Sequence, residues 1–146
     1  MDYDMIYAAI AVFLIAATPF TEIWIAIPTG IGLGLDPVSA AVIAALGNIV
    51  PMVLIILAFE RVGAWYKRRF GTNDKTRNRF GKIWDRYGLP AAAFVAPVSV
   101  GTHMALLMVL AAGTDARLSL KWMSISIVVW ALVMTPLSVL GFEILT

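Results

Sequence analysis

Residues 18–28, Thr-Pro-Phe-Thr-Glu-Ile-Trp-Ile-Ala-Ile-Pro, decide the fold because they interrupt an apolar N-terminal region with a proline and a carboxylate. An apolar stretch of 13 residues, Met5 to Ala17, precedes the interruption, and a second runs from Ile23 to Leu35. A helix needs about 20 apolar residues to cross about 30 Å of hydrocarbon. Neither stretch is that long, so we expect neither to cross a membrane alone.

The composition places the whole chain in a lipid bilayer. Of its 146 residues, 61% are hydrophobic and 14% are charged, whereas soluble domains average about 45–50% and about 25%. The chain has no cysteine and one histidine, which excludes disulfides, thiolate metal sites and clusters of several histidines. We predict an all-α integral membrane protein, a single domain over residues 1–146, with no metal and no cofactor.

Two stretches are long enough to cross the membrane. Val38–Phe59 follows Asp36, a predicted helix cap, and Pro37 at the first helical position. Trp122–Phe142 is the second predicted span. Between the spans, Ala91–Ala112 is apolar but interrupted in the middle, so it resembles the N-terminal region in design.

The segment 60–88 is basic and amphipathic. It carries nine of the eleven Lys and Arg residues, so the positive-inside rule predicts that it is cytoplasmic. Because the basic residues are confined to one segment with apolar flanks, membrane topology explains them better than nucleic-acid binding, and no nucleic-acid partner is predicted. The spacing predicts two helices lying on the membrane surface, the first with Val62, Trp65 and Tyr66 and the second with Phe80, Ile83, Trp84 and Tyr87. Membrane lipids are the predicted partner, and the expected headgroup contacts are Lys67, Arg68, Arg69, Arg79, Lys82 and Arg86. A solvated loop that carries only a topological signal is the alternative.

The chain has two halves with one layout. Residues 1–59 and 89–146 each contain a broken apolar segment, a short polar turn and one full span, at an offset of about 80 positions. Four simple crossings would place Asp2 and Asp4 inside and Arg117 and Lys121 outside, against the charge bias. If each broken segment is instead a re-entrant hairpin, the charges agree and the halves form an inverted repeat. We therefore predict hairpins, with four crossings as the alternative.

The hairpin tips need polar partners. We expect the breaks at Pro19, Pro28, Pro97 and Gly101. Irregular backbone at membrane depth is tolerated only where protein or a water-filled cavity surrounds it, so both tips must face inward. Candidates for binding the freed backbone groups, or a substrate, are Thr21, Ser99 and Thr102.

Glu22 is the strongest candidate for a functional side chain. It lies next to the first break, between apolar residues. A charge near the bilayer centre costs on the order of 3 kcal/mol, so an intramembrane carboxylate is a functional candidate by default. The alternative is a protonated glutamic acid that binds freed backbone carbonyls.

Two further side chains accompany it. His103 follows the second break, and imidazole exchanges protons near neutral pH; a structural hydrogen bond to the backbone is an equal alternative. If the tips meet, Glu22 and His103 could form a proton-carrying pair. Asn48 lies about one helical turn from Pro51 in the first span, where it either lines a cavity or belongs to ordinary helix packing.

A family resemblance supports this layout. The pattern Pro19-x-x-Glu22-Ile23-x-x-Ala26-Ile27-Pro28, followed by Leu46-Gly47-Asn48 and Pro51, resembles the bacterial and archaeal family of putative small multi-drug export proteins. The tract Tyr87-Gly88-Leu89-Pro90 through Ala96–Thr102 is similar to that family's second motif. The family is similar in layout to the DedA membrane proteins, whose re-entrant hairpins and inverted repeat are linked to lipid-carrier flipping and proton-dependent transport. The resemblance implies translocation by a multi-pass protein of the prokaryotic inner membrane.

The chain departs from the family pattern at two positions. Family members commonly carry an arginine two residues after the glutamate, where this chain has Trp24, and their Pro-x-Pro is here Pro97-x-Ser99. Without the arginine, Glu22 has no obvious counter-ion and an anionic substrate has no obvious clamp. A site for a proton or a cation is therefore favoured over a phosphate site.

We expect a small transporter or exporter, proton-coupled, with its site at the hairpin tips near the midplane. A homodimer is expected because two hairpins and two spans give little wall to enclose a pathway. The alternative is a structural or accessory subunit of a larger membrane complex. An enzyme is not predicted, because the sequence has no nucleophile–base pair or metal constellation.

Overall fold

The computed structural model describes residues 3–70 and 84–145, and all regular elements within these ranges are helices. In chain order they are α1 (Tyr3–Ala17), α2 (Glu22–Gly32), α3 (Pro37–Phe70), the π-helical turn η1 (Trp84–Gly88), α5 (Leu89–Ser99), α6 (Thr102–Ala111) and α7 (Ala116–Leu145). The prediction of an all-α fold is confirmed.

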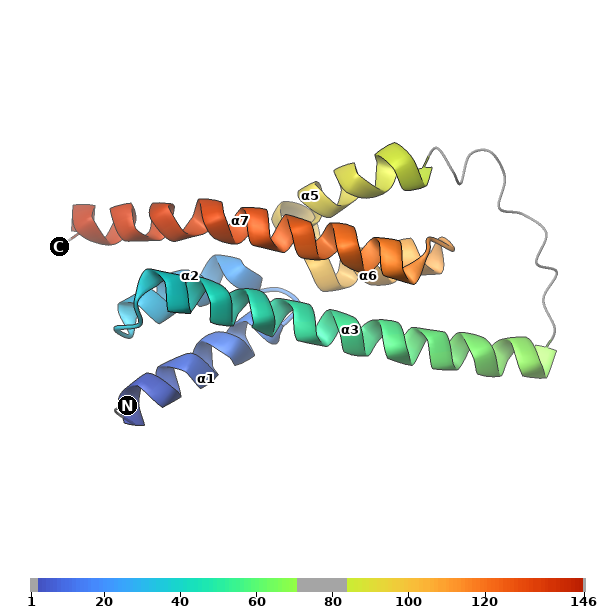
Figure 1. Cartoon of the computed structure of the whole chain (residues 1–146), viewed down its shortest axis with the longest axis horizontal. Helices are drawn as coiled ribbons and strands as arrows, with labels where there is room; N and C mark the ends of the chain where they lie inside the picture. The colour runs from blue at the N-terminus through green and yellow to red at the C-terminus, as the bar shows by residue number, and fades with distance from the viewer. Residues whose placement is uncertain (1–2, 71–83, 146) are drawn as a thin grey trace.

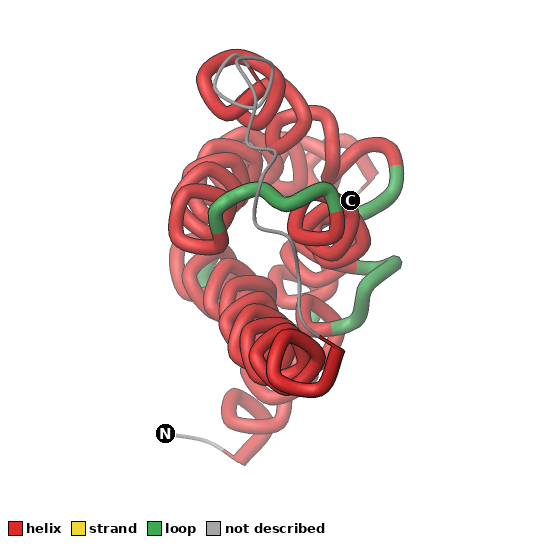
Figure 2. Tube along the Cα trace, turned by 90° about the vertical axis from the view of Figure 1, so that its right-hand side faces the viewer, coloured by secondary structure: helices red, strands yellow, loops and turns green. Residues whose placement is uncertain are grey.

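The two long helices run alongside each other, and each pair of short helices packs against them (Figure 1). Figure 1 shows α1 and α2 at one end of the long axis and α5 and α6 toward the other, with the turn of each pair near the middle. Looking along that axis, Figure 2 shows the helices nearly end-on and joined by short turns. The short helices therefore form two helical hairpins whose turns approach each other between α3 and α7.

The long helices α3 and α7 contain the candidate membrane spans, Pro37–Trp65 and Ala116–Ile144. Each is 29 residues long, with mean hydropathies of 2.6 and 2.1. Only 28% and 22% of their most apolar windows are buried inside the protein. A core helix of a soluble protein would be mostly buried, so these exposed apolar faces are those expected of helices that contact lipid.

Both long helices extend beyond the predicted spans. We predicted a first span of Val38–Phe59 followed by a separate surface helix with Val62 and Trp65, but α3 continues unbroken to Phe70. Only Gly63 in this part disfavours helix, and one glycine costs about 1 kcal/mol, too little to end a long helix. The predicted boundary between first half and connector at residue 59 therefore falls inside α3, and α7 likewise begins at Ala116 rather than at Trp122.

The second predicted surface helix lies mostly outside the described residues. Residues 71–83, which include Phe80 and Ile83, are not described, nor is the side chain of Trp84. Tyr87 belongs to η1, which leads directly into α5.

The helix breaks only partly follow the prolines. Pro19 lies in the turn between α1 and α2, and Gly101 lies between α5 and α6, as predicted. Pro28 and Pro97 are inside α2 and α5, so the prediction that they mark breaks is wrong. A proline removes one intrahelical hydrogen bond, and a helix passes through it when neighbouring elements supply packing and partners for the freed carbonyl.

The two halves end their second helix and begin their long helix in the same way. Gly34 and Gly113 follow α2 and α6 with φ of 91° and 85°. Asp36 and Asp115 then cap the next helix, each accepting a backbone hydrogen bond of 2.9 Å three residues on, from Ser39 and Leu118. Hydrogen bonds from the side chain and the backbone N–H of Ser39 hold the pKa of the Asp36 carboxyl below its ordinary value.

A close contact between α1 and α3 lies at Gly47. A Cβ at Gly47 would lie 2.5 Å from the carbonyl oxygen of Phe13 and 3.0 Å from Cβ of Ala16. Only glycine lets α1 pack so closely on α3. The next residue on α3, Asn48, is fully buried.

Candidate functional site

Four polar side chains from both halves of the chain meet where the two hairpin turns approach each other. Glu22 begins α2, Asn48 lies in α3, and Thr102 and His103 begin α6. Their exposed fractions are 1%, 0%, 0% and 2%. We call these four residues the tip cluster.

Glu22 has a backbone conformation that is rare for a residue with a side chain. Its φ is 41°, in the left-handed region, whereas Gly101, the last residue of the other turn, has φ of 85°. Left-handed backbone costs about 1–2 kcal/mol in a residue other than glycine and is found preferentially at functional sites. Glu22 also closes the first turn, since its N–H bonds the carbonyl of Thr18 at 3.3 Å.

One oxygen of Glu22 receives three contacts from the opposite hairpin. Oε1 accepts hydrogen bonds from the backbone N–H of Thr102 at 2.5 Å and from its hydroxyl at 2.8 Å. Nδ1 of His103 lies 3.3 Å from the same oxygen. The N-terminal end of α6, with its free N–H group and positive partial charge, therefore points at this carboxyl group.

The Thr102 hydroxyl joins Glu22 to Asn48. It lies 2.8 Å from both Glu22 Oε1 and Asn48 Oδ1. A hydroxyl has one proton and cannot donate to both. With a protonated Glu22, the carboxyl group donates to Thr102, which donates to Asn48 Oδ1. With an ionised Glu22, turning the Asn48 amide lets Nδ2 donate to the Thr102 hydroxyl, whose own proton then goes to Glu22. The direction of this chain of hydrogen bonds therefore depends on whether Glu22 carries a proton.

The tip cluster also holds three polar atoms that have no hydrogen-bond partner among the described residues. Among the described residues, Glu22 Oε2, Asn48 Nδ2 and His103 Nε2 are buried without a hydrogen-bond partner. In the turned orientation of the Asn48 amide, Nδ2 has a partner and Oδ1 is the atom left without one. A buried polar group without a partner costs about 1–3 kcal/mol, so in native structures such groups bind an ordered water or ion, store strain, or belong to a functional site.

A cavity of about 290 Å³ opens beside Glu22 between the two turns. Pro19 and Phe20 line it from the first turn, and Ser99 and Gly101 line it from the second. A Cβ at Gly101 would lie 2.5 Å from the carbonyl oxygen of Pro19 and 2.9 Å from Glu22 Oε1. Glycine at this position therefore lets the turns approach closely enough to form the cavity.

The other predicted tip residues bind backbone and do not join the cluster. The Thr21 hydroxyl donates to the carbonyl of Ile15 at 2.6 Å, which satisfies an acceptor at the end of α1. The Ser99 hydroxyl donates to Val95 within α5 at 3.0 Å. Of the six candidate side chains, Glu22, Asn48, Thr102 and His103 come together, and Thr21 and Ser99 complete the turns around them.

Trp24 joins the two halves, a role that the sequence analysis missed. Its Nε1 donates to the carbonyl of Pro97 at 2.7 Å, and its ring centroid lies 5.0 Å from that of Trp130 on α7. Pro97 lies in the last turn of α5, where the backbone carbonyls have no intrahelical donor. A buried indole N–H needs an acceptor, and that signal was available.

Pro97 leaves carbonyls that α7 satisfies. It has no N–H for the carbonyl of Ala93, which accepts instead from the hydroxyl of Ser126 at 2.7 Å. The neighbouring carbonyl of Phe94 accepts from Nε1 of Trp130 at 3.0 Å. These contacts explain how α5 continues through Pro97, and Ser126 is a second residue that the sequence analysis missed.

Three of the six predicted headgroup contacts have described side chains, and these lie away from the tip cluster. Arg68 and Arg69 are exposed near the end of α3, and Arg86 is exposed on η1 with its guanidinium 5.3 Å from the ring centroid of Tyr87. The side chain of Lys67 and the residues Arg79 and Lys82 lie outside the described part of the chain. Across the described residues, no group of three or more His, Asp or Glu side chains could hold a metal ion.

The comparisons with known proteins decide the family. The family model described as Putative small multi-drug export protein matches residues 22–133. The chain belongs to this family. The comparison with curated proteins and the comparison with solved structures each give no match.

The part of the chain shared with the small multi-drug export family contains the whole tip cluster. It begins at Glu22 and includes Asn48, Thr102 and His103, whereas α1 precedes it. The family name describes multi-drug export, which is consistent with a membrane protein that has two candidate spans.

Proposed function

We propose that this small multi-drug export family member is a membrane transporter in which the tip cluster binds a proton or the polar group of the substrate. The observation that carries the proposal is the buried carboxyl of Glu22, held by Thr102 and His103 from the opposite hairpin beside a cavity. Buried ionisable residues between membrane spans are typical of ion and substrate pathways. The family assignment supports the same class of function.

The lengths of the short helices support re-entrant hairpins. The 15 residues of α1 extend about 22 Å at 1.5 Å per residue, and α2, α5 and α6 are shorter still, with 11, 11 and 10 residues. None of the four reaches across about 30 Å of hydrocarbon. Two hairpins that enter from opposite sides and meet near the midplane are therefore the proposed topology, and this arrangement is an inverted repeat.

The geometry also supports a site that can change its occupancy. One Glu22 oxygen is bound by Thr102, which holds the side chain in place, whereas Oε2 has no partner among the described residues. A proton or a ligand donor can therefore bind Oε2 without breaking the contacts that join the hairpins. His103 lies close enough to share a proton with the same carboxyl group.

The test is flux into proteoliposomes that carry a pH gradient, measured with a panel of cationic and lipid substrates. Glu22→Gln keeps an oxygen for Thr102 but cannot ionise, so it should abolish gradient-driven flux while the melting temperature stays near the native value. Asp36→Asn is the matched control, because it removes an exposed carboxylate but leaves a good helix cap. Native flux in Glu22→Gln, or no flux from the native chain across the panel, would contradict the proposal.

A further inference from the structure

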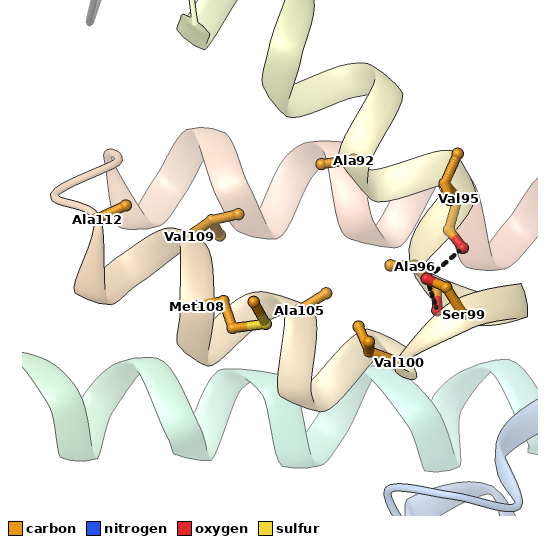
Figure 3. Close-up of a pocket in the computed structure, with 9 residues that line it drawn as sticks. All are labelled: Ala92, Val95, Ala96, Ser99, Val100, Ala105, Met108, Val109 and Ala112. Carbon is orange, nitrogen blue, oxygen red and sulfur yellow. Dashed lines mark hydrogen bonds between the residues drawn. The ribbon is translucent and has the colours of Figure 1, made fainter.

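An apolar groove lies beside the cavity at the tip cluster. It has a volume of about 400 Å³ and lies in the angle between α5 and α6. Figure 3 shows the side chains that line it, with Ala92 and Val95 on α5, Met108 and Val109 on α6, and Ser99 near the point where the two helices join. The Ser99 hydroxyl is already bonded within α5, so the lining offers a ligand mainly hydrocarbon.

The groove and the cavity meet at one place. Ser99 and Val100 line both of them, and both residues are exposed. A ligand that passes over these two residues would therefore have one end at Glu22 and the other between α5 and α6. This juxtaposition of a polar and an apolar compartment fits a molecule that is itself polar at one end and apolar at the other.

The chemistry of the cavity determines the charge of the polar end. Within the described part of the chain, Glu22 is the only charged side chain in its lining, and the aromatic rings of Phe20 and Trp24 line it as well. Aromatic faces attract cations, and quaternary ammonium groups are recognised by rings together with a carboxylate. An anionic head would meet the carboxyl group with no Lys or Arg in that lining to compensate it.

We propose that the ligand class of this site is a cationic amphiphile, with an ammonium head beside Glu22, Phe20 and Trp24 and an aliphatic part in the α5–α6 groove. The proposal rests on the proposed function, because it names the substrate class of the same site. Small-molecule sites have volumes of about 300–1,000 Å³; the groove, at about 400 Å³, lies within this range, and the cavity, at about 290 Å³, lies just below it.

The test is equilibrium binding by calorimetry, with nanodiscs that contain the full chain compared with empty nanodiscs. The probe is octyltrimethylammonium, and the comparison compounds are octyl sulfate, which reverses the charge, and tetramethylammonium, which lacks the chain. We expect the first to bind, octyl sulfate to bind about tenfold more weakly or not at all, and tetramethylammonium to bind about a hundredfold more weakly.

Two variants separate the compartments. Ala92→Leu fills the groove and should weaken octyltrimethylammonium about tenfold without changing tetramethylammonium. Ala91→Leu is the matched control, because Ala91 precedes Ala92 in α5, is exposed and does not line the groove; this variant should bind as the native chain does. Glu22→Gln should remove the preference for the cation over the sulfate. Melting temperatures near the native value confirm that each variant is folded.

Three results would overturn the inference: equal binding of the cation and the sulfate, equal binding of the cation with and without its chain, or no effect of Ala92→Leu. Each is distinct from failure of the proposed function. Flux that depends on Glu22 without binding of the cationic amphiphile would leave the transporter proposal in place and reject this ligand class. Binding of the cationic amphiphile without flux would leave this ligand class in place and reject the transporter proposal.

Discussion

Nδ1 of His103 lies 3.3 Å from Oε1 of Glu22, although 81 positions separate the two residues in the chain. Both side chains are at least 98% buried, and each begins the second helix of its hairpin. The contact is therefore the meeting point of two halves that share one layout. It also places the single histidine of the chain beside the buried carboxyl group of the tip cluster.

The first prediction concerns the pH dependence of transport. Nδ1 of His103 contacts Oε1 of Glu22, so proton exchange at this pair should make the native flux depend on pH. In His103→Gln, the side chain can still hydrogen-bond Glu22 but cannot take up a proton, and the profile should flatten. Proteoliposome flux measured at a series of internal pH values checks this. A native profile in the variant would assign the proton to another group.

The second prediction concerns the contact between the two turns. Gly101 and Gly113 both have φ of 85°, but only Gly101 has a neighbour where a Cβ would go, the carbonyl oxygen of Pro19 at 2.5 Å. Gly113→Ala should lose about 1–2 kcal/mol from backbone conformation alone. Gly101→Ala should lose about 2 kcal/mol more, because the turns must separate.

Thermal unfolding in one detergent, with both variants side by side, measures this difference. Gly113→Ala serves as the control for backbone strain. Equal losses of stability would mean that the turns do not approach each other as closely as the structure has them.

The third prediction concerns the carbonyl that Pro97 frees. Ser126→Ala should destabilise the protein by about 1–2 kcal/mol, because the buried carbonyl of Ala93 loses its donor. In a Pro97→Ala background the backbone N–H at position 97 satisfies that carbonyl, so the same change should cost less. The four melting temperatures of this double-mutant cycle give the coupling, and Ser124→Ala on the same helix is the control. A cost of Ser126→Ala that is the same in both backgrounds would reject the pairing.

Much of the fold followed from local patterns in the sequence. The hydrophobic runs predicted the helices, Asp36 and Pro37 predicted the start of α3, and the polar interruption at residues 18–22 predicted the first turn. The length and hydrophobicity of each apolar run are local properties of the sequence, and they are pronounced in a membrane protein. The continuation of α3 to Phe70 was missed because the change from apolar to basic residues indicates the edge of a membrane, and a helix can cross that edge without ending.

The site was only partly predictable. The cost of burying a carboxyl group identified Glu22, and the breaks identified Thr102 and His103 as neighbours of the second turn. Their contact with Glu22 was a conditional hypothesis, since it depends on how two distant hairpins pack. The roles of Trp24 and Ser126 depend on carbonyls of another helix, and no pattern within α2 or α7 shows which carbonyl is within reach.

The fourth prediction concerns membrane topology. The native chain has no cysteine, so single cysteines report without background. In intact cells, an impermeant maleimide should react with Asp2→Cys and Thr146→Cys but not with Thr72→Cys, since the proposed topology places the connector inside. Reaction at Thr72→Cys in intact cells, or protection of Asp2→Cys, would remove the hairpin topology.

The most direct test of the central claim, that the two turns and the tip cluster lie deep in the bilayer, is the depth of a fluorophore attached at the first turn. Phe20 is 84% exposed there, and Leu33, 52% exposed, lies at the other end of α2. A bimane is attached to Phe20→Cys or to Leu33→Cys, and each labelled protein is placed in liposomes. Nitroxide lipids labelled deep in the acyl chain should quench the Phe20 label more strongly than the Leu33 label. Nitroxides near the headgroup should quench the Leu33 label more strongly. Strongest quenching of the Phe20 label at the headgroup level would contradict the account.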